Sequence, residues 1–219
     1  MSPNNISNND VRTICENSLQ QKPQSIKRIT TGKFNESFVV EFKDPISKVP
    51  ENKNKSKKVV VRIAPPEDAG FLFYERNMMR QEPSIHKELR KKTTIPVPKI
   101  FVSDFSHDIV GRDYLIMEHL EGTAMSKAHW LSSKARTNAY FQMGEYLKQA
   151  HEIRGDKYGY VGQHKPLETE DNWWAAFQNM WEAMEQDLVS CGAYTKLEAE
   201  RFLKALKANR ESFMGRDTP

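Results

Sequence analysis

The five residues VVVRI, at positions 59–63, are the stretch around which the rest of the chain is organised. Four β-branched residues interrupted by one cation are typical of a buried strand that carries a single charge inward, and Pro65 and Pro66 end it soon afterwards. An uncompensated charge in apolar surroundings is costly, so Arg62 should meet a carboxylate, a phosphate or both. An edge strand with Arg62 pointing to solvent is the competing interpretation.

Glu82 is the candidate carboxylate for Arg62. It lies in a segment of helical composition, residues 74–92, one connection downstream of the strand. A strand cation paired with a helix glutamate positions ATP phosphates in kinase-like folds. Pro83 weakens this pairing because it would kink or restart the helix one position after Glu82, and Glu75 is then the alternative partner.

The composition indicates a globular protein. The chain has 219 residues, 38% of them hydrophobic and 28% charged, so it can bury a core as one large domain or two small ones. No apolar run approaches the roughly 20 residues that a membrane helix needs, and the polar N-terminus lacks the pattern of a signal peptide. We therefore expect no membrane partner and a cytoplasmic location. Cys15 and Cys191 lie far apart in sequence, so neither a disulfide framework nor a zinc site is indicated.

The net charge of +4 comes from 33 basic and 29 acidic residues, and much of the excess lies between residues 43 and 58. This lysine-rich segment contains no aromatic side chain, whereas nucleic-acid sites usually interleave cations with aromatics. We expect a solvated hairpin loop, the most mobile internal segment, and no nucleic-acid partner.

Strands are expected before residue 119 and helices after it. Asp10 is the expected N-cap of a short helix over residues 10–21, and Thr195 with Glu198 fits a capping box. Gly32, Asn35 and Ser37 lie in a polar turn that can fold over a nucleotide, although a single glycine favours an ordinary tight turn. The expected strands are 25–30, 38–42, 59–63, 94–102 and 112–118, and the later helices are 132–154, 171–191 and 195–214.

Five pieces of the chain resemble, in this order and with these gaps, the aminoglycoside phosphotransferase and choline kinase group of kinase-like enzymes. The pieces cover nearly all of residues 25–162. They are TTGKFNESFVVEF, VVVRIAP, RQEPSIHKELRKKTTIPVPKIFV, DYLIMEHLEG and MGEYLKQAHEIRGDKYGYVG.

The resemblance implies an α+β, protein-kinase-like fold. After an N-terminal helical segment, residues 1–24, an N-lobe over residues 25–118 would hold an antiparallel sheet with one helix and bind the nucleotide. A partial, all-helical C-lobe would occupy residues 119–219. In such a fold, residues 117–120 match the hinge between the lobes.

The resemblance also assigns the nucleotide-binding residues. Gly32, Asn35 and Ser37 match the loop that covers the nucleotide. Arg62 matches the strand cation that holds the ATP phosphates, and Glu82 matches its helix partner. In the hinge, backbone groups of Glu118 and Leu120 would hydrogen-bond the adenine edge. His151 matches a helix histidine whose role is structural rather than catalytic.

The family's catalytic loop has no match in this chain. Phosphoryl transfer in the family depends on a His-Gly-Asp motif with an Asn five residues past the Asp, and on a later magnesium-binding Asp; neither occurs among the 219 residues. His107-Asp108 lies before the hinge, which is the wrong place. We expect a chain truncated before its catalytic loop, without catalytic or metal-binding residues and inactive by itself. The complete protein would use ATP and Mg²⁺ and phosphorylate a hydroxyl group of a small molecule.

Two other functions remain open at this point. One is a naturally short, pseudokinase-like module that binds nucleotide without catalysis. The other is a protein that interacts through its tryptophan-rich helices, in which Trp174, Trp181 and Phe202 are expected to be partly uncovered. The acceptor substrate and the oligomeric state are left open by the sequence.

Overall fold

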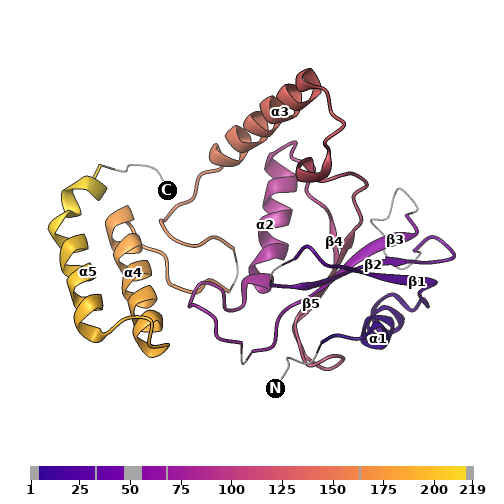
Figure 1. Ribbon diagram of the computed structural model, residues 1–219, viewed down its shortest axis with the longest axis horizontal. Coiled ribbons are helices and arrows are strands. Elements are labelled where there is room, and N and C mark those ends of the chain that lie inside the picture. The colour runs from indigo at the N-terminus through magenta and orange to yellow at the C-terminus, as the bar shows by residue number, and fades with distance from the viewer. Residues whose placement is uncertain (1–4, 33, 47–55, 68, 163, 216–219) are drawn as a thin grey trace. The chain divides into compact units, whose positions relative to one another are not determined.

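The computed structural model describes residues 5–32, 34–46, 56–67, 69–162 and 164–215 (Figure 1). The chain forms two compact units, one made of residues 1–69 and 86–147 and the other of residues 70–85 and 148–219. Most of the lysine-rich segment, whose mobility was predicted above, lies outside the described residues.

The first helix, α1 (Asn8–Leu19), begins with a reciprocal capping box. The Asp10 amide donates to Ser7 Oγ at 3.2 Å, and the Ser7 amide donates to the Asp10 carboxylate at 2.8 Å. The prediction of Asp10 as the N-cap was therefore wrong. Ser7 is the cap, because its hydroxyl satisfies an amide of the first turn while Asp10, three residues later, returns the bond.

One antiparallel sheet forms the centre of the first unit, with the strand order β1-β2-β3-β5-β4. The VVVRI stretch lies in β3, which has a neighbour on each side. The interpretation of an edge strand is therefore wrong. The strands are β1 (Ser25–Ile29), β2 (Glu36–Glu41), β3 (Lys58–Ile63), β4 (Ile100–Asp104) and β5 (Tyr114–Glu118).

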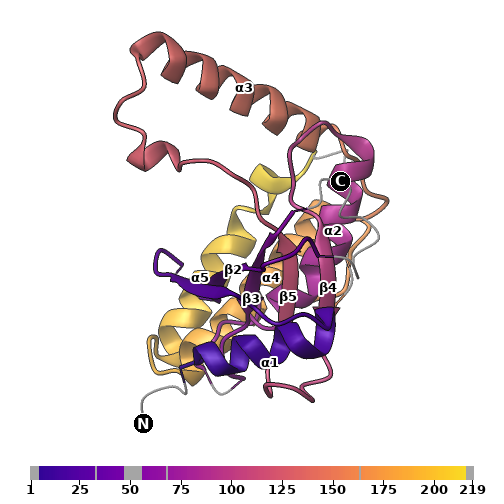
Figure 2. The ribbon, with the colours of Figure 1, turned by 90° about the vertical axis from the view of Figure 1, so that its right-hand side faces the viewer.

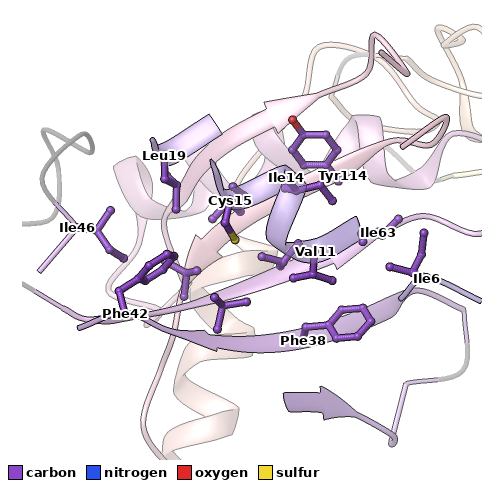
Figure 3. Packing of buried hydrophobic residues seen from close by; sticks show 14 residues of the cluster. Ile6, Val11, Ile14, Cys15, Leu19, Phe38, Phe42, Ile46, Ile63 and Tyr114 are labelled. Carbon is purple, nitrogen blue, oxygen red and sulfur yellow. The ribbon is translucent and has the colours of Figure 1, made fainter. Parts of the chain in front are cut away.

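Helix α1 packs on one face of this sheet (Figures 2 and 3). Side chains alternate along β3, so Val59, Val61 and Ile63 face α1 and are completely buried, whereas Val60 and Arg62 face the other way and are half-buried. Burial of each such aliphatic side chain stabilises the fold by about 1.5–3 kcal/mol. The α1 side chains in this core are Val11, Ile14, Cys15 and Leu19.

Two polar groups lie in or beside this apolar core. The Tyr114 hydroxyl donates to Asp104 Oδ2 at 2.7 Å and lies 2.9 Å from Ser18 Oγ, which ties β5 to β4 and to α1. Burial, reinforced by the Asp104 carboxylate, raises the pKa of Tyr114 to about 12. Burial also raises the pKa of the Cys15 thiol to about 12. Both groups are therefore neutral at physiological pH.

Helix α2 (Met78–Lys92) runs without a break through Pro83. The prediction that this proline restarts the helix was wrong, and the helix begins at Met78 and not near residue 74. Pro83 then lies in the second turn, where its missing N–H removes a single hydrogen bond, to the Met79 carbonyl. The last turns of α2 contact the segment before β4, where Arg90 Nη1 donates to the Val97 carbonyl at 2.6 Å.

Helices follow β5, as the sequence predicts. They are η1 (Met125–Lys127), α3 (Ser133–His151), α4 (Trp173–Ser190), α5 (Lys196–Ala208) and η2 (Arg210–Phe213). Among the described residues, the only strand-like pairing after β5 is an isolated bridge between Tyr158 and Glu170. The Thr195–Glu198 capping box at the start of α5 is confirmed. No helix in the described ranges is both long enough and apolar enough to cross a bilayer.

Stacked rings hold the second unit together. Phe213 lies 4.8 Å from Phe177 and 5.8 Å from Trp174, measured between ring centroids, and Trp181 stacks on Phe202 at 5.7 Å. Phe202 is 55% exposed and Trp181 half-buried, as predicted, but Trp174 is 9% exposed. The prediction for Trp174 was wrong because η2 brings Phe213 onto this side chain.

Candidate functional site

The candidate site begins with a polar pair on the face of the sheet that points away from α1. Ser37 on β2 is the direct cross-strand neighbour of Arg62 on β3, and Leu115 on β5 lies on the other side of Arg62. Side chains of directly opposed residues have Cβ atoms about 5 Å apart, so the hydroxyl and the guanidinium group can contact the same anion. Register thus brings together two of the predicted phosphate-binding residues.

The turn before β2 lies at the same end of the sheet. Gly32 and Asn35 are close in space, since a Cβ atom on Gly32 would lie 3.1 Å from the Asn35 carbonyl oxygen. The turn itself therefore favours glycine at this position. Asn35 lies two residues before Ser37, so its amide group is at the Arg62 end of β2. Gly32, Asn35, Ser37 and Arg62 share one corner of the first unit.

The predicted hinge residues lie at the other end of the same ladder. Glu118 pairs with Val59, three positions along β3 from Arg62, which corresponds to about 10 Å. The Glu118 amide donates to the Lys99 carbonyl at 2.8 Å, and the Glu118 carboxylate accepts from the Lys99 amide at 3.1 Å. The Glu118 amide is therefore occupied within the sheet, and binding of a base by the Glu118 carbonyl stays a prediction. Leu120, the second predicted residue, is 49% exposed.

Glu82 belongs to the second compact unit, while Arg62 belongs to the first. The pairing of these two residues therefore stays a prediction. Glu75, the alternative partner, accepts a hydrogen bond from the Leu72 amide at 3.0 Å and so stabilises its own turn. The segment around Glu75 is fastened to α4 by Asp187, which accepts from the Phe73 amide and from Arg76. Sequence patterns gave no signal for Asp187.

Glu36 is a second residue that sequence reasoning missed. Its carboxylate accepts hydrogen bonds from Arg112 Nη1 at 2.9 Å, from Arg28 Nη2 and from the Ile6 amide at 3.2 Å. The alternation along β2 places Glu36 on the α1 face, opposite to Ser37. That alternation was the available signal, since it implied a charged side chain on a buried face.

Neither histidine singled out in the sequence has a catalytic arrangement. His107 Nε2 lies 2.8 Å from the carboxylate of buried Asp113, and the left-handed backbone at His107 (φ 67°) directs the ring towards it. This contact ties the β4–β5 connection to β5. His151 is the last residue of α3 and is exposed, and its structural role stays a prediction.

A divalent cation would need oxygen ligands close together. The residues described by the structure contain no group of three or more His, Cys, Asp or Glu side chains that could hold a metal ion. Binding of a nucleotide by Ser37, Arg62 and the hinge stays a prediction.

Comparison with known proteins gives three likenesses. A model of the phosphotransferase enzyme family matches residues 51–217. A subtelomeric hrmA-associated cluster protein of Aspergillus fumigatus is 27% identical over 146 residues, which cover 65% of this chain and 26% of the relative. A thermostable mutant of aminoglycoside phosphotransferase APH(4)-Ia, crystallised with AMP-PNP and hygromycin B, has a TM-score of 0.53 at 11% identity.

The matched regions cover most of this chain but a smaller share of each of the proteins that it resembles. The alignment with APH(4)-Ia covers 90% of this chain and 58% of that structure. The chain spans about a quarter of the length of the curated relatives that it matches. At such low identity the structural likeness bears on the fold alone, and it confirms the predicted α+β, kinase-like arrangement.

Proposed function

Because this chain belongs to the phosphotransferase enzyme family, we propose that it supplies the nucleotide-binding part of an enzyme that transfers the γ-phosphoryl group of ATP to a hydroxyl group of a small molecule. The observation that supports this most directly is the β2–β3–β5 register. It sets a phosphate-binding pair, Ser37 and Arg62, about 10 Å along the sheet from Glu118. An extended nucleotide has the same two ends, a base and a chain of phosphates.

Each predicted residue has one role in this proposal. Asn35 and Ser37 donate hydrogen bonds to phosphate oxygens, and Gly32 lets the turn close beside them. Arg62 compensates the phosphate charge, and Glu82 orients Arg62. The Glu118 carbonyl and the Leu120 backbone bind the adenine edge. In the same proposal, residues 25–118 form the N-lobe and residues 119–219 part of the C-lobe, after a helical segment over residues 1–24.

The chemical step belongs to the complete enzyme. The acceptor hydroxyl oxygen attacks the γ-phosphorus, the bond from that phosphorus to the β–γ bridging oxygen breaks, and ADP leaves while a carboxylate takes the hydroxyl proton. None of the 219 residues matches the family's base, so the chain by itself should bind nucleotide without turning it over. Mg²⁺ would neutralise charge on the phosphates, and no residue of this chain is assigned to it.

The choice of ligands is supported by one relative. APH(4)-Ia was crystallised as a ternary complex with a nucleotide analogue and a small molecule, which is the pair of ligand classes proposed for this protein. The acceptor here is defined only by its reacting hydroxyl group. A reducing, cytoplasmic setting is part of the proposal and is supported by the two free thiols, Cys15 and Cys191.

Titration calorimetry with AMP-PNP on the 219-residue chain tests the nucleotide site. Arg62→Ala should weaken binding about tenfold or more, because a charge-assisted hydrogen bond contributes about 1.5–3 kcal/mol and 1.4 kcal/mol is tenfold in affinity. Lys92→Ala is the control, since it removes an exposed cation paired with Glu88 on α2 and should change affinity less than twofold. Equal affinities of Arg62→Ala and the parent chain would contradict the proposed site.

A coupled assay for ADP release tests the absence of turnover. The 219-residue chain, given ATP, Mg²⁺ and hydroxyl acceptors, should release no ADP above the rate without protein. Turnover that depends on Arg62 would show that this stretch of chain carries its own catalytic groups.

A further inference from the structure

The Glu36 carboxylate joins four parts of the first unit. Both of its oxygens lie near the Ile6 amide, at 3.2 and 3.3 Å, and one of them accepts from Arg112 Nη1 at 2.9 Å. Arg28 Nη2 contacts the other oxygen and also donates to the Ile6 carbonyl at 2.9 Å. The carboxylate on β2 thus connects three other parts: the residues before α1, strand β1, and Arg112, which lies just before β5.

This cluster differs from an ordinary surface ion pair. The Arg112 side chain is 8% exposed and that of Glu36 17%, so water screens their attraction only weakly. Exposed pairs, in contrast, contribute little because water and salt screen them. Arg28 is the more exposed partner, and its guanidinium group lies over the Phe38 ring, 5.1 Å from the centroid.

The cluster lies directly behind the proposed phosphate site. Glu36 shares the α1 face with Phe38 and with its β3 partner Ile63, while Ser37, the next residue, shares the opposite face with Arg62. Ile6 and Ile63 lie at the same end of the buried cluster in Figure 3. A displacement of the backbone at Glu36 therefore moves both neighbours of this residue, Asn35 and Ser37.

We infer that Glu36 is a positioning residue for nucleotide binding, which acts by locking the start of β2 to the segment before α1. The inference rests on the proposed nucleotide site and extends it to a group on the far face of the sheet. Glu36 itself contacts no phosphate in this arrangement. Its contribution is to hold Asn35 and Ser37 in place before the nucleotide arrives, which reduces the ordering that binding requires.

Glu36→Gln is the first test, because it keeps the shape of the side chain and removes its charge. Titration with AMP-PNP at a temperature where all variants are folded should show an affinity about fivefold weaker than that of the parent chain. Glu36→Asp keeps the charge, so its affinity for AMP-PNP should lie between those of Glu36→Gln and the parent chain. Both proteins are compared with Leu19→Ala, which removes a buried side chain from the other end of α1 and leaves the cluster intact.

Leu19→Ala separates positioning from general stability. It should lower the thermal unfolding temperature at least as much as Glu36→Gln does, yet leave the affinity for AMP-PNP within twofold of the parent value. If both variants weaken binding in proportion to the stability they lose, Glu36 acts only through stability and the inference is overturned.

Hydrogen exchange without nucleotide provides a readout that does not depend on binding. Measured against amides of β3 in the same protein, amides in the stretch 35–38 should exchange at least threefold faster in Glu36→Gln than in the parent chain, and no faster in Leu19→Ala. If the parent chain fails to bind AMP-PNP, the proposed function fails while this exchange still decides whether Glu36 locks the strand. Parent rates in Glu36→Gln would overturn the inference whatever the outcome of the titration.

Discussion

The α1–sheet core and the α4–α5 pair achieve burial in different ways. Along β2, β3 and β5, alternate side chains point into one layer that α1 covers, and many of them are completely buried. Between α4 and α5, in contrast, a cavity of about 280 Å³ remains, lined mostly by apolar side chains that include Trp181, Leu188 and Phe202. Of the proposed nucleotide residues, Ser37, Arg62 and Glu118 lie on strands of this sheet. A polar site on a rigid sheet keeps its geometry, which a loosely packed helix pair does not provide.

The largest effect should come from a cavity in the sealed core. Ile14→Ala removes a completely buried side chain and should lower the free energy of unfolding by about 2–5 kcal/mol. Phe202→Ala, on the other side of the comparison, removes a side chain that is 55% exposed and contacts the rings of Trp181 and Tyr194, so the substitution should lower this free energy by only about 1–2 kcal/mol. Urea unfolding followed by far-ultraviolet circular dichroism measures both values. Equal losses would remove the contrast between the two regions.

Phe213→Ala sharpens the comparison within the helical unit. Its ring contacts Trp174 and Phe177, and aromatic pairs contribute about 0.5–1.5 kcal/mol each beyond their buried area, so about 2 kcal/mol should be lost. The loss should be local to this unit. Hydrogen exchange should therefore show faster exchange along α4 and unchanged rates in β3. Faster exchange in both would mean that the two regions unfold as one.

The same capping motif occurs in both regions and allows a matched pair of substitutions. Ser7→Ala and Thr195→Ala each remove an N-cap hydroxyl, which costs about 1 kcal/mol. Ser7→Ala should lower the stability of the whole sheet unit, because α1 covers its core. Thr195→Ala should only fray the start of α5. Hydrogen exchange of β3 distinguishes them, and identical profiles would contradict this difference.

The smallest expected effect is a pH dependence at Asp104. Partial burial pushes the pKa of Asp104 upward, but hydrogen bonds from the amide and hydroxyl of Ser106 and from Tyr114 outweigh it and hold the pKa below its usual value. The stabilisation is therefore present above about pH 4, the usual value, and is lost as the pH falls through the lower folded pKa. The stability difference between the parent chain and Asp104→Asn should shrink between pH 5 and pH 2. A constant difference would show that the charge of Asp104 contributes nothing.

Local patterns predicted the fold well, because the signals were local. Four β-branched residues around Arg62 indicated a buried strand, and Thr195 with Glu198, three residues apart, formed the expected capping box. The start of α1 was misplaced because Asp10 was taken as the N-cap, whereas Ser7, one turn earlier, holds that position. The start of α2 was misplaced because the stretch before Met78 has helical composition, but the left-handed backbone of Asn77 (φ 57°) interrupts the helix there.

The site was predicted less completely, because its contacts are distant in sequence. Local patterns pointed to Gly32, Ser37 and Arg62, whereas Glu118 and Leu120 came only from the resemblance, and only the register showed that Ser37 and Arg62 are neighbours. Glu36 binds Ile6 and Arg112, which lie 30 and 76 residues away, so the alternation along β2 can place this carboxylate on the buried face but cannot identify its partners. Asp187 is similar, because its partner Arg76 lies 111 residues away. Such partners become visible only when the chain has folded.

The two cysteines differ in exposure, so the rate at which a thiol reagent labels them reports how often the core opens. Only a thiolate reacts with iodoacetamide, and at pH 8 the Cys15 thiol, with its pKa near 12, is both neutral and covered by the sheet. Cys191 is exposed and is labelled at once. Cys15 can therefore be labelled only when α1 separates from the sheet. The doubly labelled fraction, measured by mass spectrometry over time, gives the frequency of that opening.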